Sequence, residues 1–280
     1  MTKKRKKHTG IKILAALIII CAAGLLYSKF GLTVTRYKVA SDRLPESFDG
    51  FRIVQLSDLH GSSFGGDNER LVRAVEREAP DLIVMTGDFI DNKKGRVADV
   101  ESLVNRLVPI APVYYVSGNH DWATGEIEAL AEALERAGAR YLRNESILLE
   151  QGDGRIVLAG VEDPNGRADM VKPNEFVDRI NADYPDDYIV LLGHRNYWIE
   201  RYPDLEVDLI LCGHSHGGIV RLPGLGGIIG TNGDLLPEYD DGLFSSGRYS
   251  MIVSRGLGNS VPVPRFLNTP EIVTLILYSK

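Results

Sequence analysis

The chain has little cysteine, with only Cys21 and Cys212 among its 280 residues. Because a single cysteine lies beyond residue 30, that part of the chain has no internal disulfide, and a small disulfide-stapled scaffold is excluded. Internal repeats and low-complexity tracts are also absent after residue 30. A hydrophobic content of 44% with 25% charged residues is typical of a globular protein and excludes a disordered or collagen-like chain. The length suits one large α/β domain or two small ones.

Positive charge is scarce outside the N terminus. Seven of the 32 lysines and arginines lie in residues 1–30, which contain no acid, so the remainder has 25 basic residues against 38 acidic ones. A body this acidic repels a phosphate backbone, so we expect no nucleic-acid partner. If the protein acts on phosphates, a group other than its basic side chains must neutralise them.

Long hydrophobic runs are absent except at residues 13–26, which follow the basic cluster Lys3–Lys7. This order is typical of a secretory signal or of an uncleaved signal-anchor. The run is short against the roughly 20 residues that a spanning helix needs. It reaches the lower limit when it is extended to Phe30, with Lys12 and Lys29 snorkelling to the two interfaces.

These features predict a single-pass membrane anchor over residues 1–30, a connecting segment over 31–50 and a globular domain over 51–280. No good small-x-small cleavage site follows the apolar run. The basic flank predicts that the N terminus is cytoplasmic and that the domain lies on the extracytoplasmic face of the cell membrane. A cleaved signal peptide is the alternative.

Beyond residue 50, short apolar runs alternate with helical periodicity. The runs predict strands at residues 52–56, 82–86, 113–116, 155–160, 188–192 and 209–212. Amphipathic patterns predict helices at residues 67–79, 97–107 and 126–137. Further strands are predicted at residues 33–37, 217–222, 249–253 and 271–277. The pattern indicates a layered α/β domain with helices on its outer faces.

Imidazole, carboxylate and amide side chains follow five of these predicted strands. They are Asp58 and His60, Asp88 and Asp91, Asn119 with His120 and Asp121, His194, and His214 with His216. Five of the six histidines belong to this set. Open α/β sheets bind ligands at the carboxyl ends of their strands. Aspartate, histidine and asparagine suit Mn, Fe or Zn. The set is too large for one ion, so we predict two divalent metal ions that clamp a phosphoryl group.

In order and spacing, these residues resemble the calcineurin-like metallophosphoesterase superfamily. The matching blocks are Asp58-x-His60, Gly87-Asp88-x-x-Asp91, Gly118-Asn119-His120-Asp121, His194, and Gly213-His214-x-His216. Residues 217–223, 254–258 and 263–266 resemble the membrane-anchored bacterial branch typified by YkuE and YaeI. The chain departs from the pattern at Gly193-His194-Arg195-Asn196, where relatives usually read Ser-His-x-Pro. The resemblance implies a layered α/β/β/α sandwich over residues 51–280, preceded by one N-terminal membrane-anchor helix.

The resemblance also implies a ligand set. One ion would be held by Asp58, His60 and His216, the other by Asn119, His194 and His214, with Asp88 bridging both. A water that bridges the ions would attack phosphorus as hydroxide. His120 would then protonate the leaving alkoxide, Asp121 would orient the His120 ring, and Asp91 would support its loop without touching metal.

The implied activity is that of a metal-dependent phosphoester hydrolase of the phosphodiesterase or pyrophosphatase type. A lipid-linked substrate such as UDP-2,3-diacylglucosamine is one alternative, and teichoic-acid or phospholipid phosphodiesters are others. The apolar residues around Gly224–Gly233 predict either a lip for such a substrate or an ordinary hairpin. They are Leu225, Ile228, Ile229, Leu235 and Leu236.

Two further points stay open at this stage. Arg167, Arg195 and Arg255 are either substrate contacts or surface cations. A non-catalytic metal-binding scaffold at the membrane is the alternative to an enzyme.

Overall fold

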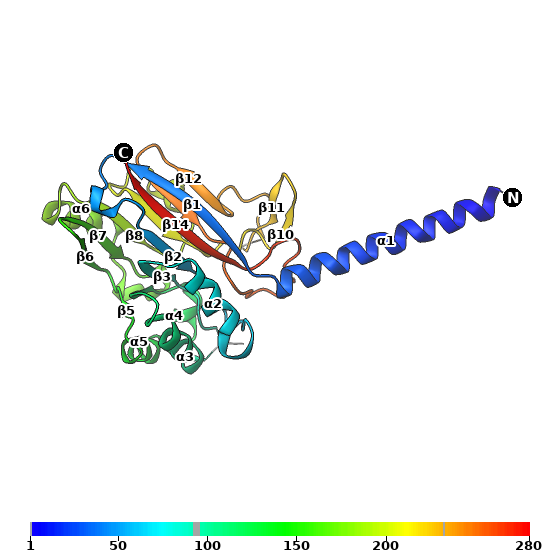
Figure 1. The fold of residues 1–280 in the computed structure, drawn as a ribbon, viewed down its shortest axis with the longest axis horizontal. Helices are drawn as coiled ribbons and strands as arrows, with labels where there is room; N and C mark the ends of the chain where they lie inside the picture. The colour runs from blue at the N-terminus through cyan, green and yellow to red at the C-terminus, as the bar shows by residue number, and fades with distance from the viewer. Residues whose placement is uncertain (1, 92–95, 232) are drawn as a thin grey trace.

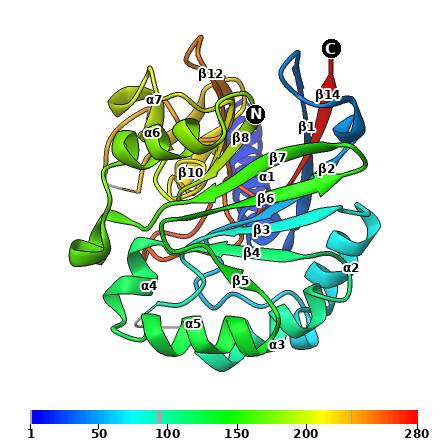
Figure 2. The ribbon, with the colours of Figure 1, turned by 90° about the vertical axis from the view of Figure 1, so that its left-hand side faces the viewer.

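The computed structural model describes residues 2–91, 96–231 and 233–280, and the side chains of the basic flank at residues 1–10 lie outside the described part. Within it, two six-stranded sheets lie face to face (Figures 1 and 2). The first sheet, in spatial order, contains β1 (Thr33–Ser41), β14 (Glu271–Ser279), β2 (Arg52–Leu56), β3 (Leu82–Thr86), β4 (Val113–Val116) and β5 (Arg140–Tyr141). The second contains β12 (Gly242–Ser245), β13 (Ser250–Val253), β9 (Leu209–Cys212), β8 (Tyr188–Leu192), β7 (Gly154–Gly160) and β6 (Glu145–Gln151). A separate hairpin is formed by β10 (Val220–Leu222) and β11 (Gly226–Ile229).

Helices cover the outer face of each sheet. The first sheet is covered by α2 (Glu69–Arg77), α3 (Val97–Leu107) and α5 (Ile127–Arg136), and the second by α6 (Pro173–Asp183) and α7 (Trp198–Arg201). Short helical segments are α4 (Asn119–Ala123), η1 (Glu46–Phe48), η2 (Gly66–Asn68) and η3 (Pro164–Asp169). The predicted α/β/β/α sandwich is therefore confirmed.

Burial on both faces explains the continuous apolar strands. In β3, Val84 packs between the two sheets, while Ile83 and Met85 pack under the helices. All five residues of β3 are buried. Strands that are covered on both sides lose the apolar–polar alternation of a half-exposed sheet, which is why the sequence shows short uninterrupted hydrophobic runs there.

The segment predicted as a connector, residues 31–50, contains a full strand of the first sheet. β1 pairs in parallel with β14 from Thr33–Glu271 to Ser41–Ser279. The folded body thus begins at about residue 33 instead of residue 51. The sequence pattern marked only residues 33–37 as extended, because the later part of β1 is partly exposed and polar.

Helix α1 (Thr2–Phe30) extends away from the globular body (Figure 1). Its segment Ile11–Phe30 is 20 residues long and apolar enough to cross a membrane. Most of its large apolar side chains are exposed, including Ile13, Ile19 and Leu26. A solvent-exposed apolar surface of this length needs a covering, and a lipid bilayer supplies one.

Candidate metal centre

The predicted site residues meet at one edge of the sandwich. Strands β2, β3 and β4 run parallel in the first sheet, as do β7, β8 and β9 in the second. Because the two sheets face each other, loops that follow β2, β3 and β4 meet loops that follow β8 and β9. Residues that are up to 158 positions apart are thereby brought into one buried cluster.

One group consists of Asp58, His60 and His216, all fully or almost fully buried. The Nε2 atoms of His60 and His216 lie 3.2 Å apart. The Oδ1 atom of Asp58 lies 3.4 Å from Nε2 of His216 and 3.9 Å from Nε2 of His60. Ligand atoms about 2.1 Å from one ion are separated by roughly 3.0–3.4 Å. Both separations at His216 fall within this range, and the one between Asp58 and His60 is slightly longer.

A second group consists of Asp88, His194 and His214. The Nε2 atom of His194 lies 3.2 Å from Oδ2 of Asp88 and 3.2 Å from Nδ1 of His214. Nearby, the buried Oδ1 atom of Asn119 has no hydrogen-bond partner among the described residues. A buried amide oxygen without a donor is costly unless something else binds it, and a cation would do so.

Asp88 connects the two groups. Its Oδ2 atom lies 3.6 Å from Nε2 of His60 and 3.2 Å from Nε2 of His194, one residue from each group. Its other oxygen, Oδ1, accepts a hydrogen bond from the backbone N–H of His120 at 2.8 Å. The carboxylate is therefore held in place while one oxygen faces both ligand groups, which fits the predicted bridge.

Five of these residues have a left-handed backbone, with φ between 45° and 70°. They are Asp58, His60, Asp88, His214 and His216. Only 12 non-glycine residues in the described part of the chain have a positive φ. Such conformations strain a residue that has a Cβ atom, and they gather at functional sites where the fold imposes them.

Glycines allow the loops to approach closely. A Cβ atom added at Gly118 would collide with the carboxylate of Asp88, and one at Gly213 would collide with that of Asp58. The loops after β4 and β9 can reach the carboxylates only because these two positions lack side chains.

The histidines of the cluster differ in protonation. His194 donates from Nδ1 to the carbonyl of Thr86 at 2.8 Å, which leaves Nε2 directed at the cluster. Burial lowers the pKa of His194, but the charge of Asp88 overrides this and raises it to about 10. Burial lowers the pKa of both His214 and His216 to about 3, so these two rings are neutral and offer lone pairs.

His120 lies beside the cluster and is half-buried. Its ring meets that of His60 edge-on, with centroids 4.7 Å apart. Nitrogens of His60 and His120 and a carboxylate oxygen of Asp91 lie within 4.8 Å of one another. The Oδ2 atom of Asp91 also lies 3.5 Å from Nδ1 of His60. Burial lowers the pKa of His120, and the charges of Asp88 and Asp91 oppose this effect, so both carboxylates lie close to the ring.

The carboxylate of Asp121 does not bond to the His120 ring, as the resemblance implied, but to other groups. Its carboxylate accepts hydrogen bonds from the hydroxyl of Tyr115 and from the backbone N–H groups of Asp88, Phe89, Ile90 and Gly118. Both oxygens are occupied in this way, so the expectation that Asp121 orients the His120 ring is revised. Burial, with the charge of Asp88 adding to it, raises the pKa of Asp121 to about 6. Asp121 holds the loop that carries Asp88.

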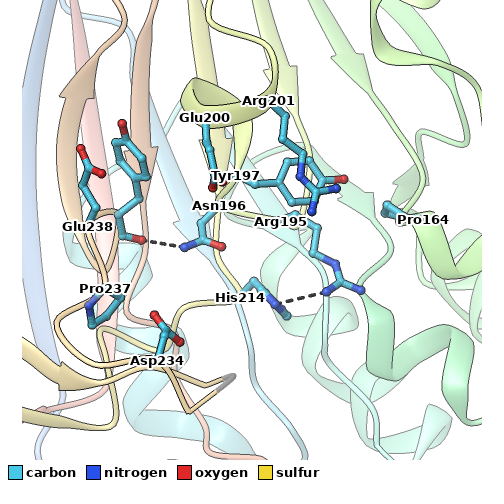
Figure 3. Close-up of a pocket in the computed structure, with 11 residues that line it drawn as sticks. Pro164, Arg195, Asn196, Tyr197, Glu200, Arg201, His214, Asp234, Pro237 and Glu238 are labelled. Atoms are coloured by element: carbon cyan, nitrogen blue, oxygen red, sulfur yellow. Dashed lines mark hydrogen bonds between the residues drawn. The ribbon is translucent and has the colours of Figure 1, made fainter.

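A cavity of about 410 Å³ opens beside His214 (Figure 3). Arg195 projects into it and donates from Nη1 to Nε2 of His214 at 3.2 Å. The guanidinium is held by two hydrogen bonds to Asp163, of 2.6 and 3.1 Å. Arg201 stacks over the ring of Tyr197 in the same cavity, with its guanidinium carbon 4.3 Å from the ring centroid. The cavity lining also includes acidic side chains such as Glu200.

The three arginines singled out in the sequence have different surroundings. Arg195 contacts the candidate ligand His214, and Arg167 is exposed. Arg255 forms a 2.7 Å ion pair with Glu271. The interpretation of Arg195 and Arg255 as surface cations was wrong. Sequence reasoning did not find Asp163, which orients Arg195, because a lone aspartate before a proline resembles an ordinary helix cap.

Comparison with known proteins agrees with this geometry. The calcineurin-like phosphoesterase family matches residues 51–218. An uncharacterized metallophosphoesterase of Aquifex aeolicus is 32% identical over 89% of this chain and 93% of its own length. YkuE of Bacillus subtilis, also an uncharacterized metallophosphoesterase, is 29% identical over 95% of this chain and 94% of its own length. LpxG of Chlamydia muridarum, a UDP-2,3-diacylglucosamine pyrophosphatase, is 29% identical over 82% of this chain and 85% of its own length.

A solved structure shares the fold. A dimetal phosphatase from Danio rerio superimposes with a TM-score of 0.53 over 82% of this chain and 93% of that chain, at 12% identity. The family match covers more than half of the sequence and includes every predicted ligand. The chain therefore belongs to the calcineurin-like phosphoesterase family and is a metal-dependent phosphoester hydrolase.

Proposed function

We propose that this protein hydrolyses phosphodiester or pyrophosphate bonds at a centre of two divalent metal ions. Asp58, His60 and His216 would hold one ion. Asn119, His194 and His214 would hold the other, and Asp88 would bridge them. The observation that carries this proposal is the position of Asp88 Oδ2, 3.6 Å from His60 Nε2 and 3.2 Å from His194 Nε2. Mn, Fe and Zn all suit this nitrogen and oxygen donor set.

When bound, the two cations would neutralise the phosphoryl group and supply a hydroxide nucleophile at neutral pH. The basic side chains do not provide this charge. Of the two arginines that contact the cluster, Arg195 is already paired with Asp163. The other, Arg265, is buried and donates to the carbonyls of Gly258 and Arg255. His120, half-buried at the edge of the cluster, would give a proton to the leaving oxygen.

Two carboxylates would position the reacting groups. Asp91, near the rings of both His60 and His120, would set the orientation of the His120 imidazole. Asp121 would hold the loop of Asp88 through the N–H groups of Asp88, Phe89 and Ile90. A non-catalytic scaffold needs neither His120 nor its carboxylate neighbour, so their retention favours the enzyme.

The proposed substrate is a lipid-linked phosphoester. Support comes from the related pyrophosphatase LpxG, whose name gives a diacylated sugar nucleotide as substrate. The cavity beside His214 combines arginine, tyrosine and acidic side chains, which suits a polar head group with hydroxyls. Helix α1 would anchor the enzyme in the cell membrane. Its basic flank supports an orientation with the N terminus in the cytoplasm and the catalytic domain on the extracytoplasmic face.

The test is hydrolysis of bis(4-nitrophenyl) phosphate by the full chain in detergent, with Mn²⁺ added after removal of bound metal. We expect turnover that depends on the metal and falls strongly in the Asp88→Asn variant. Turnover that is independent of the metal, or no higher than that of Asp88→Asn, would contradict the proposal. Release of UMP from UDP-2,3-diacylglucosamine, followed by mass spectrometry, then tests the lipid-linked substrate.

A further inference from the structure

Helix α1 is docked on the catalytic body and is not a loose tether. Among the side chains of its membrane-length segment whose burial is described, Gly24 and Ser28, one helical turn apart, are the buried ones. The ring of Phe266 and a methyl group of Leu267 lie directly against Gly24. Ser28 Oγ accepts a hydrogen bond from the N–H of Asn268 at 3.1 Å. A helix that is cut off after export would not need a buried, hydrogen-bonded contact of this kind.

This contact fixes the depth of the loop Pro262–Asn268 in the membrane. A hydrocarbon core of about 30 Å needs about 20 helical residues. The segment Ile11–Phe30 supplies 20, and Lys3–Lys7 prevents a large shift of the span toward the N terminus. Gly24 lies six residues before Phe30, which is roughly 9 Å along the helix axis. The side chains that pack on Gly24 therefore lie inside the bilayer, below its surface.

The composition of the loop agrees with this depth. Val263 is 50% exposed and Leu267 is 39% exposed. The loop's charged residue, Arg265, is only 6% exposed and points inward, donating from Nε to the carbonyl of Gly258 at 2.9 Å. A loop that faced water would more often show the reverse arrangement, with the charge outside and the aliphatic groups inside.

The hairpin β10–β11 continues the same surface. Arg221 N–H donates to the carbonyl of Phe266 at 3.0 Å, and Phe266 N–H donates to Ile219 at 3.2 Å, so hairpin and loop are joined. Figure 1 shows the hairpin and the end of α1 on the same side of the body. The exposed apolar side chains of the hairpin and its flanking turn are Leu222, Leu225, Ile229, Leu235 and Leu236.

Between α1 and the loop lies a cleft of about 650 Å³. Its walls combine apolar residues such as Leu25, Phe30 and Leu257 with the polar side chains Lys29, Ser62, Ser63 and Asn259. One wall is the last part of the membrane helix, from Leu25 to Phe30, so the cleft extends from the interface at Lys29 to the outer part of the lipid tails. The apolar part of this lining suits an acyl chain better than water.

The loop is also bonded to the metal centre. Asn268 Nδ2 donates to the carbonyl of His216 at 2.7 Å, and Nη2 of Arg265 lies 3.2 Å from Nδ1 of His216. One layer of side chains thus separates the membrane-facing loop from a candidate metal ligand. Ser28, Asn268 and His216 form a continuous path from α1 to the site.

We propose that the loop Pro262–Asn268 and the hairpin β10–β11 insert into the same leaflet as the end of α1, with a phospholipid acyl chain in the cleft. The metal centre then stands at the surface of the membrane, where the phosphoester head groups of lipids lie. This inference rests on the proposed hydrolase function for its substrate class, but the insertion of the loop is independent of that function.

The depth of the loop is measured with a nitroxide label in phosphatidylcholine nanodiscs. Val263→Cys is labelled in a Cys21→Ser background, in which the remaining Cys212 is fully buried. The matched control is Glu132→Cys, at an exposed position of helix α5, which lies on the part of the body away from α1 (Figure 1). We expect the label at 263 to collide with oxygen more than with a water-soluble nickel chelate, and the label at 132 to do the reverse. Equal exposure of both labels to the nickel chelate would overturn the proposal.

Activity gives a second readout with two probes that share a leaving group. One is a diacylglyceryl 4-nitrophenyl phosphate in phosphatidylcholine vesicles, and the other is soluble bis(4-nitrophenyl) phosphate. Val263→Asp combined with Leu235→Asp is expected to slow hydrolysis of the lipid probe about fivefold or more and to leave the soluble probe unchanged. The variant Val263→Ala with Leu235→Ala is the control and should affect both probes little.

The outcomes separate the two proposals. An equal loss on both probes, or no loss on either, contradicts the membrane-inserted face. Absence of hydrolysis of both probes by the unchanged protein contradicts the hydrolase proposal, while the label at 263 still decides the depth of the loop.

Discussion

The imidazole of His194 and the carboxylate of Asp88 form a buried pair across the two sheets, with Nε2 and Oδ2 3.2 Å apart. His194 follows β8 of the second sheet, and Asp88 follows β3 of the first. Without metal, the Asp88 charge keeps His194 protonated, against the effect of burial, because its pKa is raised to about 10. A metal ion must replace that proton.

Metal binding should therefore release a proton and strengthen with pH. His194 is protonated in the metal-free protein below its pKa of about 10, whereas His214 and His216, with pKa values near 3, are already neutral. Between about pH 6.5 and pH 10, the apparent affinity for Mn²⁺ should rise roughly tenfold per pH unit because one proton is displaced. Calorimetry in buffers of different ionisation enthalpy measures the release. His194→Gln should lose it, and a pH-independent affinity in the unchanged protein would contradict this assignment.

Asp88→Asn and Asp91→Asn should differ in metal content. An amide at 88 removes the charge that faces both His60 and His194, so we expect weak binding of both ions and loss of most activity. An amide at 91 keeps both ligand groups intact and should retain two ions while lowering kcat through the orientation of His120. Metal analysis alongside steady-state rates makes the comparison. Similar metal content and similar residual activity in the two variants would rule out a bridging Asp88.

His120→Ala should harm substrates with poor leaving groups most. If His120 donates a proton to the leaving oxygen, its loss should cost about 10²–10⁴ in rate when that oxygen is an alkoxide. A 4-nitrophenolate leaves without a proton, so the loss should be smaller for an aryl ester. Rates are compared for methyl 4-nitrophenyl phosphate and for a dialkyl phosphate. An equal loss on both would mean that His120 acts in another way.

Gly118→Ala should destabilise the site by steric collision. A Cβ atom there meets the carboxylate and the backbone nitrogen of Asp88. Forcing these groups apart should lower the free energy of unfolding by about 1–3 kcal/mol and weaken metal binding. Gly66→Ala is the control, because the space around Gly66 is open. Thermal unfolding with and without Mn²⁺ measures both effects, and equal behaviour of the two variants would refute the steric argument.

The sequence predicts the central strands well because each one is a short continuous run of apolar residues, which can be recognised without knowing its partners in the fold. The bounds of residues 113–116 and 188–192 agree with β4 and β8, whose apolar residues stop at the polar residues that form the site. Strand β6 and helix α6 were not predicted, since their partly exposed faces give weak periodicity. The polar blocks also predict which residues gather, because parallel strands end at a shared edge.

The sequence does not predict which carboxylate faces His120. Adjacent residues suggested Asp121, but α4 begins at Asn119, and successive side chains on a helix point about 100° apart, as 3.6 residues per turn requires. Asp121 therefore points inward to the loop of Asp88, and Asp91 from another loop lies near the His120 ring. The contact between Ser28 and Asn268 spans 240 residues and leaves no local signal.

The anomalous scattering of crystals grown with saturating Mn²⁺ tests the central claim most directly. We expect two peaks about 3.5–4 Å apart, the usual spacing of paired catalytic ions, on either side of the Asp88 carboxylate. One peak, or none, at this edge of the sandwich would contradict the two-metal centre.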